Sequence, residues 1–261
     1  MQLIKKALHG TTGLVGFRVI RTGYGALAWL TENSELAGRV LGYPHVFEPD
    51  AGHRHRWLKE LGIRSVIDIG AHEGEYAKRI HEILPEAPIV SFEPQPDCFE
   101  KLKAVSQTLP RHTAHNLALG SAPGTATMHK NEFSQASSLL PVGPGMKREL
   151  PFSVQTEPVS VPVQTLDAVA AKLELEDNLF VKIDVQGFEC EVIKGGQATL
   201  RRAKIVIVET TFRPIYEGQP LFGDVYSALV ELGFRYAGSD GRLDSPVDGA
   251  PIQEDSVFRR D

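Results

Sequence analysis

The 261-residue sequence has few cysteines and no long run of basic residues. Its two cysteines, Cys98 and Cys190, are too few for a disulfide framework and lack the close spacing of metal ligands. Lysine and arginine total 28 against 33 acidic residues, which gives a net charge of −5. A chain without a basic stretch is poorly suited to binding the phosphates of a nucleic acid independently of the base sequence. We therefore expect a cytoplasmic protein with no nucleic-acid partner.

The N-terminal part also lacks an uninterrupted apolar run. His9, Arg18 and Arg21 divide residues 7–30, so this stretch predicts neither a transmembrane span nor a signal peptide. We expect residues 1–60 to form a helical cap. Three roles are open for this cap: it could cover a ligand cleft, support a homodimer or make peripheral contact with an anionic membrane surface. The apolar residues that suggest amphipathic helices are Leu3, Leu8, Leu14, Phe17, Ile20, Leu27 and Leu30.

Beyond the cap, short apolar strands alternate with helices. The composition, 42% hydrophobic and 23% charged, suits one large α/β domain. Helices between strands require parallel crossovers, so residues 61–261 are expected to form a Rossmann-like, mostly parallel sheet of seven strands. Residues 124–163 break the alternation with proline-punctuated pieces, which predicts a β-rich insertion over the active face. The expected strands are 66–69, 89–92, 112–117, 179–183, 203–208, 234–238 and 256–260, and the expected helices are 75–84, 97–107, 165–172, 189–194 and 222–232.

The run Val66-Ile67-Asp68-Ile69-Gly70-Ala71-His72-Glu73-Gly74 predicts a strand, a glycine turn and the start of a helix. Glycines let the backbone approach a ligand without a Cβ in the way, and a helix N-terminus directs free N–H groups toward that ligand. Glu93 follows the next strand, where a carboxylate can accept hydrogen bonds from both hydroxyls of a ribose. These features together predict a nucleoside cofactor. The alternative is a plain turn and a solvated acid.

The glycine spacing distinguishes between two such cofactors. A pyrophosphate needs the pattern G-x-G-x-x-G, whereas here Gly70 and Gly74 stand farther apart and His72 occupies the place of the second glycine. Acidic side chains surround the turn, and they suit a ligand with a cationic sulfonium and an α-ammonium group. S-adenosylmethionine (SAM) has both cations, so the sequence favours SAM over NAD. The acids are Asp68, Glu73 and Glu75.

A second set of acids follows strands later in the chain. Asp184 and Glu209 each follow a run of β-branched residues. Because the carboxyl ends of parallel strands meet at one edge of a sheet, we expect both acids on the same face as Asp68 and Glu93. Asp184 and Glu209 would offer two oxygen ligands to Mg²⁺, but no third ligand is evident and no metal is assigned. Lys182 on the same strand as Asp184 is expected either to pair with a carboxylate or to reach solvent.

These stretches, in this order and spacing, resemble the FkbM family of SAM-dependent methyltransferases. The likeness runs from about Ser65 to Glu209. It implies a seven-stranded class I methyltransferase sheet with its last strand antiparallel, and O-methylation of a hydroxyl on a sugar, glycan or secondary metabolite. The family usually has an acid where Gln186 stands, so no charged role is carried over to that position. The matching stretches are Val66 to Gly74, Ser91-Phe92-Glu93-Pro94, Asn116 to Gly120, Ser137-Ser138-Leu139, Thr165-Leu166-Asp167 and Val181 to Glu189.

The resemblance also implies a set of site residues. Cofactor contacts are implied for Asp68, Gly70, His72, Gly74, Glu93, Pro94, Gln95, Asn116, Ala118 and Asp184. Contacts with the acceptor are expected for Ser137, Ser138 and Glu209, with a plain turn as the alternative for the two serines. A sugar-type hydroxyl is weakly nucleophilic and needs a base, for which Asp184 is the first candidate and His72 the second.

Two other functions remain open at this stage. An NAD-dependent oxidoreductase would share the turn and the ribose-binding acid, and a non-catalytic, methyltransferase-like binding module would share the whole sheet. The acceptor, expected to be a small molecule or glycan with a free hydroxyl, is not identified.

Overall fold

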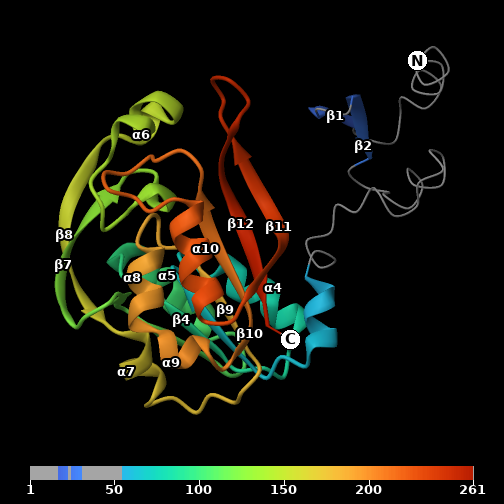
Figure 1. Ribbon diagram of the computed structural model, residues 1–261, viewed down its shortest axis with the longest axis vertical. Helices are drawn as coiled ribbons and strands as arrows, with labels where there is room; N and C mark the ends of the chain where they lie inside the picture. Colours follow the sequence, from blue (N-terminus) through green and yellow to red (C-terminus); the bar gives the residue numbers. More distant parts are fainter. Residues whose placement is uncertain (1–16, 23–24, 31–54, 261) are drawn as a thin grey trace. The chain divides into compact units, whose positions relative to one another are not determined.

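The computed structural model describes residues 17–22, 25–30 and 55–260 (Figure 1). Contacts divide the chain into two compact units, Met1–Arg54 and His55–Asp261. In the first unit, β1 (Phe17–Thr22) and β2 (Gly25–Leu30) form an antiparallel hairpin. The prediction of helices is therefore wrong for this part, because β-branched and aromatic residues such as Phe17 and Val19 favour strands.

The rest of the predicted cap, residues 1–16 and 31–54, lies outside the described residues. Its proposed roles in a homodimer and at a membrane surface stay predictions. The last part of the predicted cap forms a short helix, η1 (Arg56–Leu61), and belongs to the second unit, because Leu58 is fully buried in that unit's core. Every helix within the described ranges is too short or too polar to cross a lipid bilayer.

The second unit is built on a seven-stranded sheet with the order β11-β12-β10-β9-β3-β4-β5. β12 runs opposite to the other six strands of this sheet, as predicted for the last strand. The sheet thus has the strand order and direction of a Rossmann-like methyltransferase fold. Its strands are β3 (Ser65–Ile69), β4 (Ile89–Phe92), β5 (His112–His115), β9 (Leu179–Ile183), β10 (Ala203–Thr211), β11 (Arg235–Asp244) and β12 (Pro251–Arg259).

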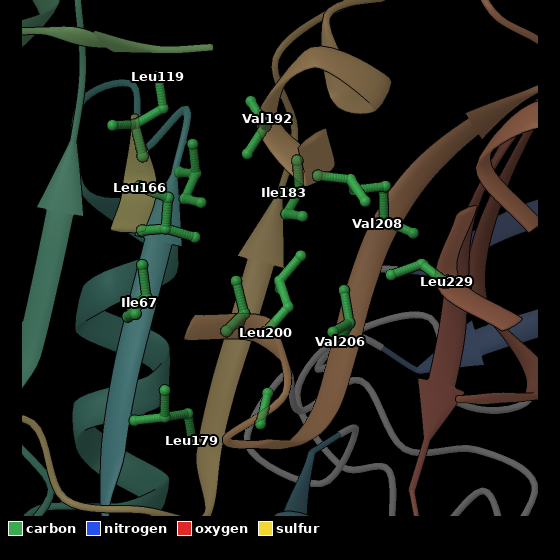
Figure 2. Close-up of a cluster of buried hydrophobic side chains, with 14 of the residues drawn as sticks. Ile67, Leu119, Leu166, Leu179, Ile183, Val192, Leu200, Val206, Val208 and Leu229 are labelled. Atoms are coloured by element: carbon green, nitrogen blue, oxygen red, sulfur yellow. The ribbon is translucent and has the colours of Figure 1, made fainter. Parts of the chain in front are cut away.

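Helices cover both faces of this sheet. One face packs against α7 (Leu166–Ala170), α8 (Glu189–Gly195), α9 (Gln197–Leu200) and α10 (Phe222–Glu231), and Figure 2 shows the apolar side chains that meet there. The other face packs against α4 (Glu75–Ile83) and η1. The helix α5 (Pro96–Ser106) contacts the edge strand β5. Burial on both faces explains why the central strands read as continuous apolar runs.

The alternation of side chains along these strands decides where the acids point. Val66, Phe180 and Ile207 all pack on the α4 face. Because direction repeats every second residue, Asp68, Lys182 and Glu209 lie on that same face, near the carboxyl ends of their strands. The register agrees, since Asp68 on β3 is opposite Lys182 on β9.

The predicted insertion is a separate three-stranded sheet with the order β6-β8-β7. Its strands are β6 (Ala118–Leu119), β7 (Gly124–Asn131) and β8 (Thr156–Gln164), and η2 (Ser134–Ala136), α6 (Pro144–Glu149) and η3 (Pro151–Ser153) lie between β7 and β8. The β-rich character is confirmed. Residues 137–140 form no strand and contribute one isolated bridge, between His129 and Ser138.

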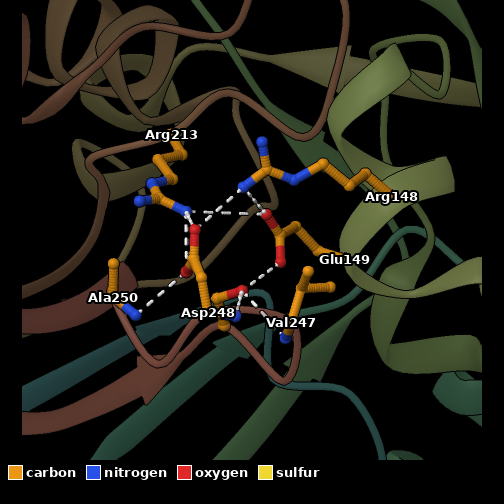
Figure 3. A network of polar contacts seen from close by, with 7 residues as sticks. Arg148, Glu149, Arg213, Val247, Asp248 and Ala250 are labelled. Atoms are coloured by element: carbon orange, nitrogen blue, oxygen red, sulfur yellow. Dashed lines mark hydrogen bonds and ion pairs between the residues drawn. The ribbon is translucent and has the colours of Figure 1, made fainter.

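A cluster of charged groups ties α6 to the connection between β11 and β12 (Figure 3). Arg213 donates to both oxygens of Asp248, at 3.0 and 2.8 Å. Glu149 on α6 is buried, lies 2.7 Å from Arg148 and accepts a hydrogen bond from Ser245 at 2.5 Å. These contacts thus fasten α6 of the insertion to the connection between β11 and β12.

Candidate active site

A cavity of about 400 Å³ opens at the carboxyl ends of β3, β4, β9 and β10, with the insertion forming another wall. Of the residues predicted for the site, ten line this cavity: Gly70, His72, Glu93, Pro94, Gln95, Ala118, Ser137, Ser138, Asp184 and Glu209. Asp68, Gly74 and Asn116 lie outside its lining. The topology therefore brings three of the four strand-end acids, Glu93, Asp184 and Glu209, to one cavity.

The turn after β3 lies directly against the end of β9. Gly70 has φ of +79°, and a Cβ built there would come 1.8 Å from the carbonyl oxygen of Asp184. The backbone N–H of Asp184 donates to the carbonyl of Ile69 at 2.9 Å. Only glycine combines this conformation with so close an approach. The close contact fixes the turn relative to Asp184.

Glu93 is held by the backbone on both of its oxygens. Oε1 accepts the N–H of Gln95 at 2.7 Å, and Oε2 accepts the N–H of His72 at 2.9 Å. Burial raises the pKa of Glu93 to about 7, although the two N–H groups oppose that shift. Asn116 donates to the carbonyls of Glu93 and Pro94, at 2.9 and 3.1 Å. Asn116 therefore shapes the loop after β4. It was expected to contact the cofactor, but it does not line the cavity.

Asp68 and Gly74 act beneath the cavity. The Asp68 carboxyl is fully buried and accepts a long hydrogen bond, 3.4 Å, from Ser91, whose hydroxyl lies 2.9 Å from Nε2 of His112. Burial raises the pKa of Asp68 to about 6, while Lys182 lowers it. Among the described residues, Oδ1 of Asp68 has no hydrogen-bond partner. Gly74, with φ of +91°, lets α4 pack closely on α5.

Asp184 forms a salt bridge with Lys182 and a hydrogen bond with Gln186. Nζ of Lys182 lies 2.8 Å from Oδ2 of Asp184, and the side-chain amide of Gln186 donates to Oδ1 at 2.9 Å. Burial works against the charged carboxylate, but the Lys182 charge and the hydrogen bonds from Lys182 and Gln186 together outweigh it, so the pKa of Asp184 is lowered. Of the two alternatives left open for Lys182, pairing with a carboxylate is the one observed, and the lowered pKa favours the ionised form of Asp184.

Glu209 has a different environment although it lies close by. Its Oε2 accepts hydrogen bonds from the amides of Gln186 at 3.0 Å and Gln253 at 2.8 Å. Burial and the neighbouring Asp184 raise the pKa of Glu209 well above its usual value. Thus two carboxyl groups that share one amide donor favour opposite protonation states.

Glu189 supports the turn that carries Gln186. Its Oε1 accepts the N–H groups of Val185 at 3.2 Å and Gly187 at 3.0 Å. Within this turn Gln186 has φ of +52° and Gly187 has φ of +101°. Glu189 is buried, which raises its pKa to about 7.

The insertion contacts the site through serine hydroxyls. Ser138 donates to the backbone carbonyl of Gln186 at 2.6 Å and accepts from Leu140 N–H at 2.9 Å, so its hydroxyl is engaged within the protein. Ser137 accepts the N–H of Asn131 at 3.0 Å. The Nε2 atom of His72 lies 2.7 Å from the hydroxyl of Ser134. His72 therefore links the glycine turn to the insertion.

Comparison with known proteins agrees with this geometry. Residues 68–236 match the methyltransferase FkbM domain. The chain belongs to the FkbM methyltransferase family. It is 26% identical over 160 residues to the 2-O-methyltransferase NoeI of Sinorhizobium fredii (strain NBRC 101917 / NGR234). That match covers 59% of this chain and 66% of the relative, so the chain spans somewhat less than two thirds of the relative's length.

Solved methyltransferase structures show a more distant similarity. The methyltransferase FkbM of Methylobacillus flagellatus KT gives a TM-score of 0.48 at 14% identity, over 76% of this chain and 43% of that one. The magnesium protoporphyrin IX methyltransferase of Synechocystis PCC 6803, solved with bound SAM, gives 0.44 at 12% identity, over 80% of each chain.

One group of metal-ligand type side chains occurs in the described part of this FkbM methyltransferase. Atoms of His72, Glu73 and Cys98 lie within 4.8 Å of one another. Glu73 is paired with Lys101 at 2.5 Å, and His72 contacts Ser134. Burial raises the pKa of Cys98 to about 11, which keeps the thiol protonated. Glu73 and His72 thus already have partners within the protein, and no metal is assigned to this group.

Several site residues of this methyltransferase were not predicted. Tyr216 donates to Oε1 of Gln186 at 2.9 Å, and Gln253 contacts Glu209. Arg79 and Tyr76 on α4 line the cavity. No local motif marks these positions. Gln253 could have been found only from the antiparallel register, which places it opposite Thr211, two residues beyond Glu209.

Proposed function

We propose that this methyltransferase transfers the methyl group of SAM to a hydroxyl oxygen of a sugar-like small molecule or glycan. The observation that carries the proposal is the Glu93 carboxyl, held by two backbone N–H groups at the end of β4, beside the Gly70 turn. A carboxyl in that place suits the two hydroxyls of a ribose. The 2-O-methyltransferase relative supports an oxygen acceptor.

The described residues fit this cofactor. The Gly70 turn offers backbone without a Cβ at the cavity wall, and Pro94, Gln95 and Ala118 line the part of the cavity next to Glu93, where an adenosine would lie. Asp68, buried beneath the turn and outside the cavity lining, would add negative charge below the cavity, which favours a cationic ligand. When bound, SAM supplies a methyl group on a positively charged sulfur.

Asp184 is the proposed base. An ionised carboxylate in the cavity orients an acceptor hydroxyl by accepting its hydrogen bond, which holds the oxygen ready for attack. The lowered pKa makes Asp184 a weak base. A weak base suffices, because the hydroxyl proton becomes strongly acidic as the new C–O bond forms. Lys182 keeps Asp184 ionised until then and stays protonated itself.

Calorimetric titration with S-adenosylhomocysteine (SAH) tests the cofactor assignment. We expect micromolar binding, roughly −8 kcal/mol, and loss of measurable binding in the double variant Gly70→Val, Glu93→Ala. Circular dichroism controls for folding. Unchanged affinity in the folded double variant would contradict the assignment.

A second assay tests catalysis. The protein is incubated with methyl-labelled SAM and a panel of methyl glycosides, and label in an O-methyl product is measured. We expect transfer with wild type and its loss in Asp184→Asn. SAH binding without transfer to any acceptor would favour the non-catalytic module instead. The family assignment already disfavours an NAD-dependent oxidoreductase.

A further inference from the structure

A single amide connects the two acids at the acceptor end of the cavity. The Nε2 atom of Gln186 lies 2.9 Å from Oδ1 of Asp184 and 3.0 Å from Oε2 of Glu209. A side-chain amide nitrogen carries two hydrogens, so each carboxyl receives one. Both of the residue's donor hydrogens are therefore directed at these two acids.

Three residues hold the Gln186 turn, and one of them contacts the side-chain amide itself. The Tyr216 hydroxyl lies 2.9 Å from Oε1 of Gln186 and 3.1 Å from the carbonyl oxygen of Ala136, and in this arrangement the amide nitrogen faces the acids. The Ser138 hydroxyl donates to the backbone carbonyl of Gln186 at 2.6 Å. Glu189 holds the flanking N–H groups of the turn. Reversing the amide would set its oxygen against two carboxyl groups, at a large electrostatic cost.

The two acids use their oxygens differently. Oδ1 and Oδ2 of Asp184 each have a donor within the protein, Gln186 and Lys182. On Glu209, Gln186 and Gln253 both bond to Oε2, and Oε1 takes part in neither bond. Because Glu209 lines the cavity, Oε1 is the oxygen available to a bound molecule.

We propose that Gln186 is a positioning residue. Its amide holds Asp184 where that carboxylate can take the proton of the substrate hydroxyl, and it directs Oε1 of Glu209 at another polar group of the same substrate. The inference rests on the proposed function for the identity of that molecule, but the arrangement of the three side chains does not depend on it. Without the amide, two carboxyl groups would face each other across the site, and ionising both would be unfavourable.

The other titratable groups that face this pair come from several elements. They are Lys182 on β9, Asp68 on β3, His72 in the glycine turn, Glu189 on α8, Asp255 on β12 and Tyr216 after β10. Because these groups also face the pair, a further substitution is needed to show that a measured pH dependence comes from Asp184 and Glu209.

The test compares thermal unfolding of wild type and Gln186→Met between pH 5 and pH 8, without cofactor. Removing the amide should raise the folded-state pKa of the pair, so the variant should lose stability as pH rises. We expect the Tm deficit of the variant to be larger at pH 8 than at pH 5 by about 4 °C. Gln107→Met, at an exposed glutamine that ends α5, is the matched control and should show no such difference.

Adding Glu209→Gln to Gln186→Met should remove the extra pH dependence. SAH affinity should change less than about threefold in Gln186→Met, because Gln186 acts on the acceptor side of the site. A Tm deficit that is equal at both pH values would show that Gln186 only fills space and would overturn the proposal. Absence of SAH binding in wild type would instead count against the proposed function and leave this comparison intact.

Discussion

Glu93 and Glu209 both lie at the carboxyl ends of buried strands in one sheet, but different parts of the chain hold them. Two backbone N–H groups bind Glu93: that of Gln95, two residues along the chain, and that of His72, in the glycine turn. Side chains of Gln186 and Gln253, from distant segments, bind Glu209. Glu93, in the proposed cofactor half of the site, is thus held by main chain, whose geometry is set by the fold. Glu209, in the proposed acceptor half, is held by side chains, which can be exchanged without changing the fold.

The largest effect should come from breaking the contact that joins the halves. Gly70→Ala places a Cβ at 1.8 Å from the Asp184 carbonyl and forces a left-handed φ on alanine. We expect a loss of more than about 3 kcal/mol in the free energy of unfolding, measured by urea denaturation. The matched control is Gly62→Ala, where φ is +63° and nothing lies within 4 Å of the new Cβ. This control should lose only about 1 kcal/mol. Equal losses would show that the close approach is unimportant.

The next effect isolates the acceptor half. Asp184→Asn keeps the shape of the side chain but removes the charge paired with Lys182 and the proposed base. We expect the rate of labelled methyl transfer to fall by roughly 10²–10⁴-fold. SAH affinity, measured by calorimetry, should change far less. A matching fall in SAH affinity would mean that Asp184 belongs to the cofactor half.

A third experiment compares one backbone-held acid from each half. Burial raises the pKa of both Glu93 and Glu189 to about 7. Such groups stabilise the fold below the unfolded-state pKa of about 4.3, and this stability is lost as pH rises through about 7. Wild type should lose unfolding free energy between pH 5 and pH 8. In Glu189→Gln this loss should be smaller than in wild type by on the order of 2 kcal/mol.

Glu93→Gln should flatten the same pH profile, because Glu93 has the same raised pKa. It should also weaken SAH binding about tenfold, whereas Glu189→Gln should leave SAH binding nearly unchanged. Calorimetry on the two variants separates the outcomes. If both variants lost SAH affinity equally, the division between the halves would be wrong.

The smallest effect is expected at the clamp on the insertion. Asp248 is exposed, and hydrogen bonding from Arg213 lowers its pKa to about 2. Because exposed ion pairs contribute little, Asp248→Ala should lower the Tm by no more than about 2 °C at pH 7. A much larger decrease would show that the insertion depends on this clamp for its position.

The cofactor half could be predicted from the sequence because its parts are close together along the chain. The glycine turn and Glu93 fall within one strand–helix–strand unit, and the parallel direction of the strands followed from the alternation of strands and helices. Even there, contacts decided details that a motif does not contain. Asn116 holds the loop after β4, and Asp68 turns to Ser91 beneath the cavity.

The acceptor half was predicted only in part. Asp184 and Glu209 were found as strand-end acids, but Tyr216 and Gln253 reach the site through long-range packing that leaves no local pattern. The hairpin of β1 and β2 was missed for a related reason. Leucines at helical spacing outweighed the β-branched residues between them, and antiparallel pairing decided the outcome.

The contact between Gly70 and Asp184 has a thermodynamic consequence. The turn and the end of β9 are joined by the N–H of Asp184 on the carbonyl of Ile69, so neither can shift alone. If SAM alters the turn, it alters the carboxylate that receives the acceptor. Linkage then requires that the acceptor change the affinity for SAM by the same factor that SAM changes the affinity for the acceptor. SAH titrations with and without a saturating acceptor would measure that reciprocal coupling.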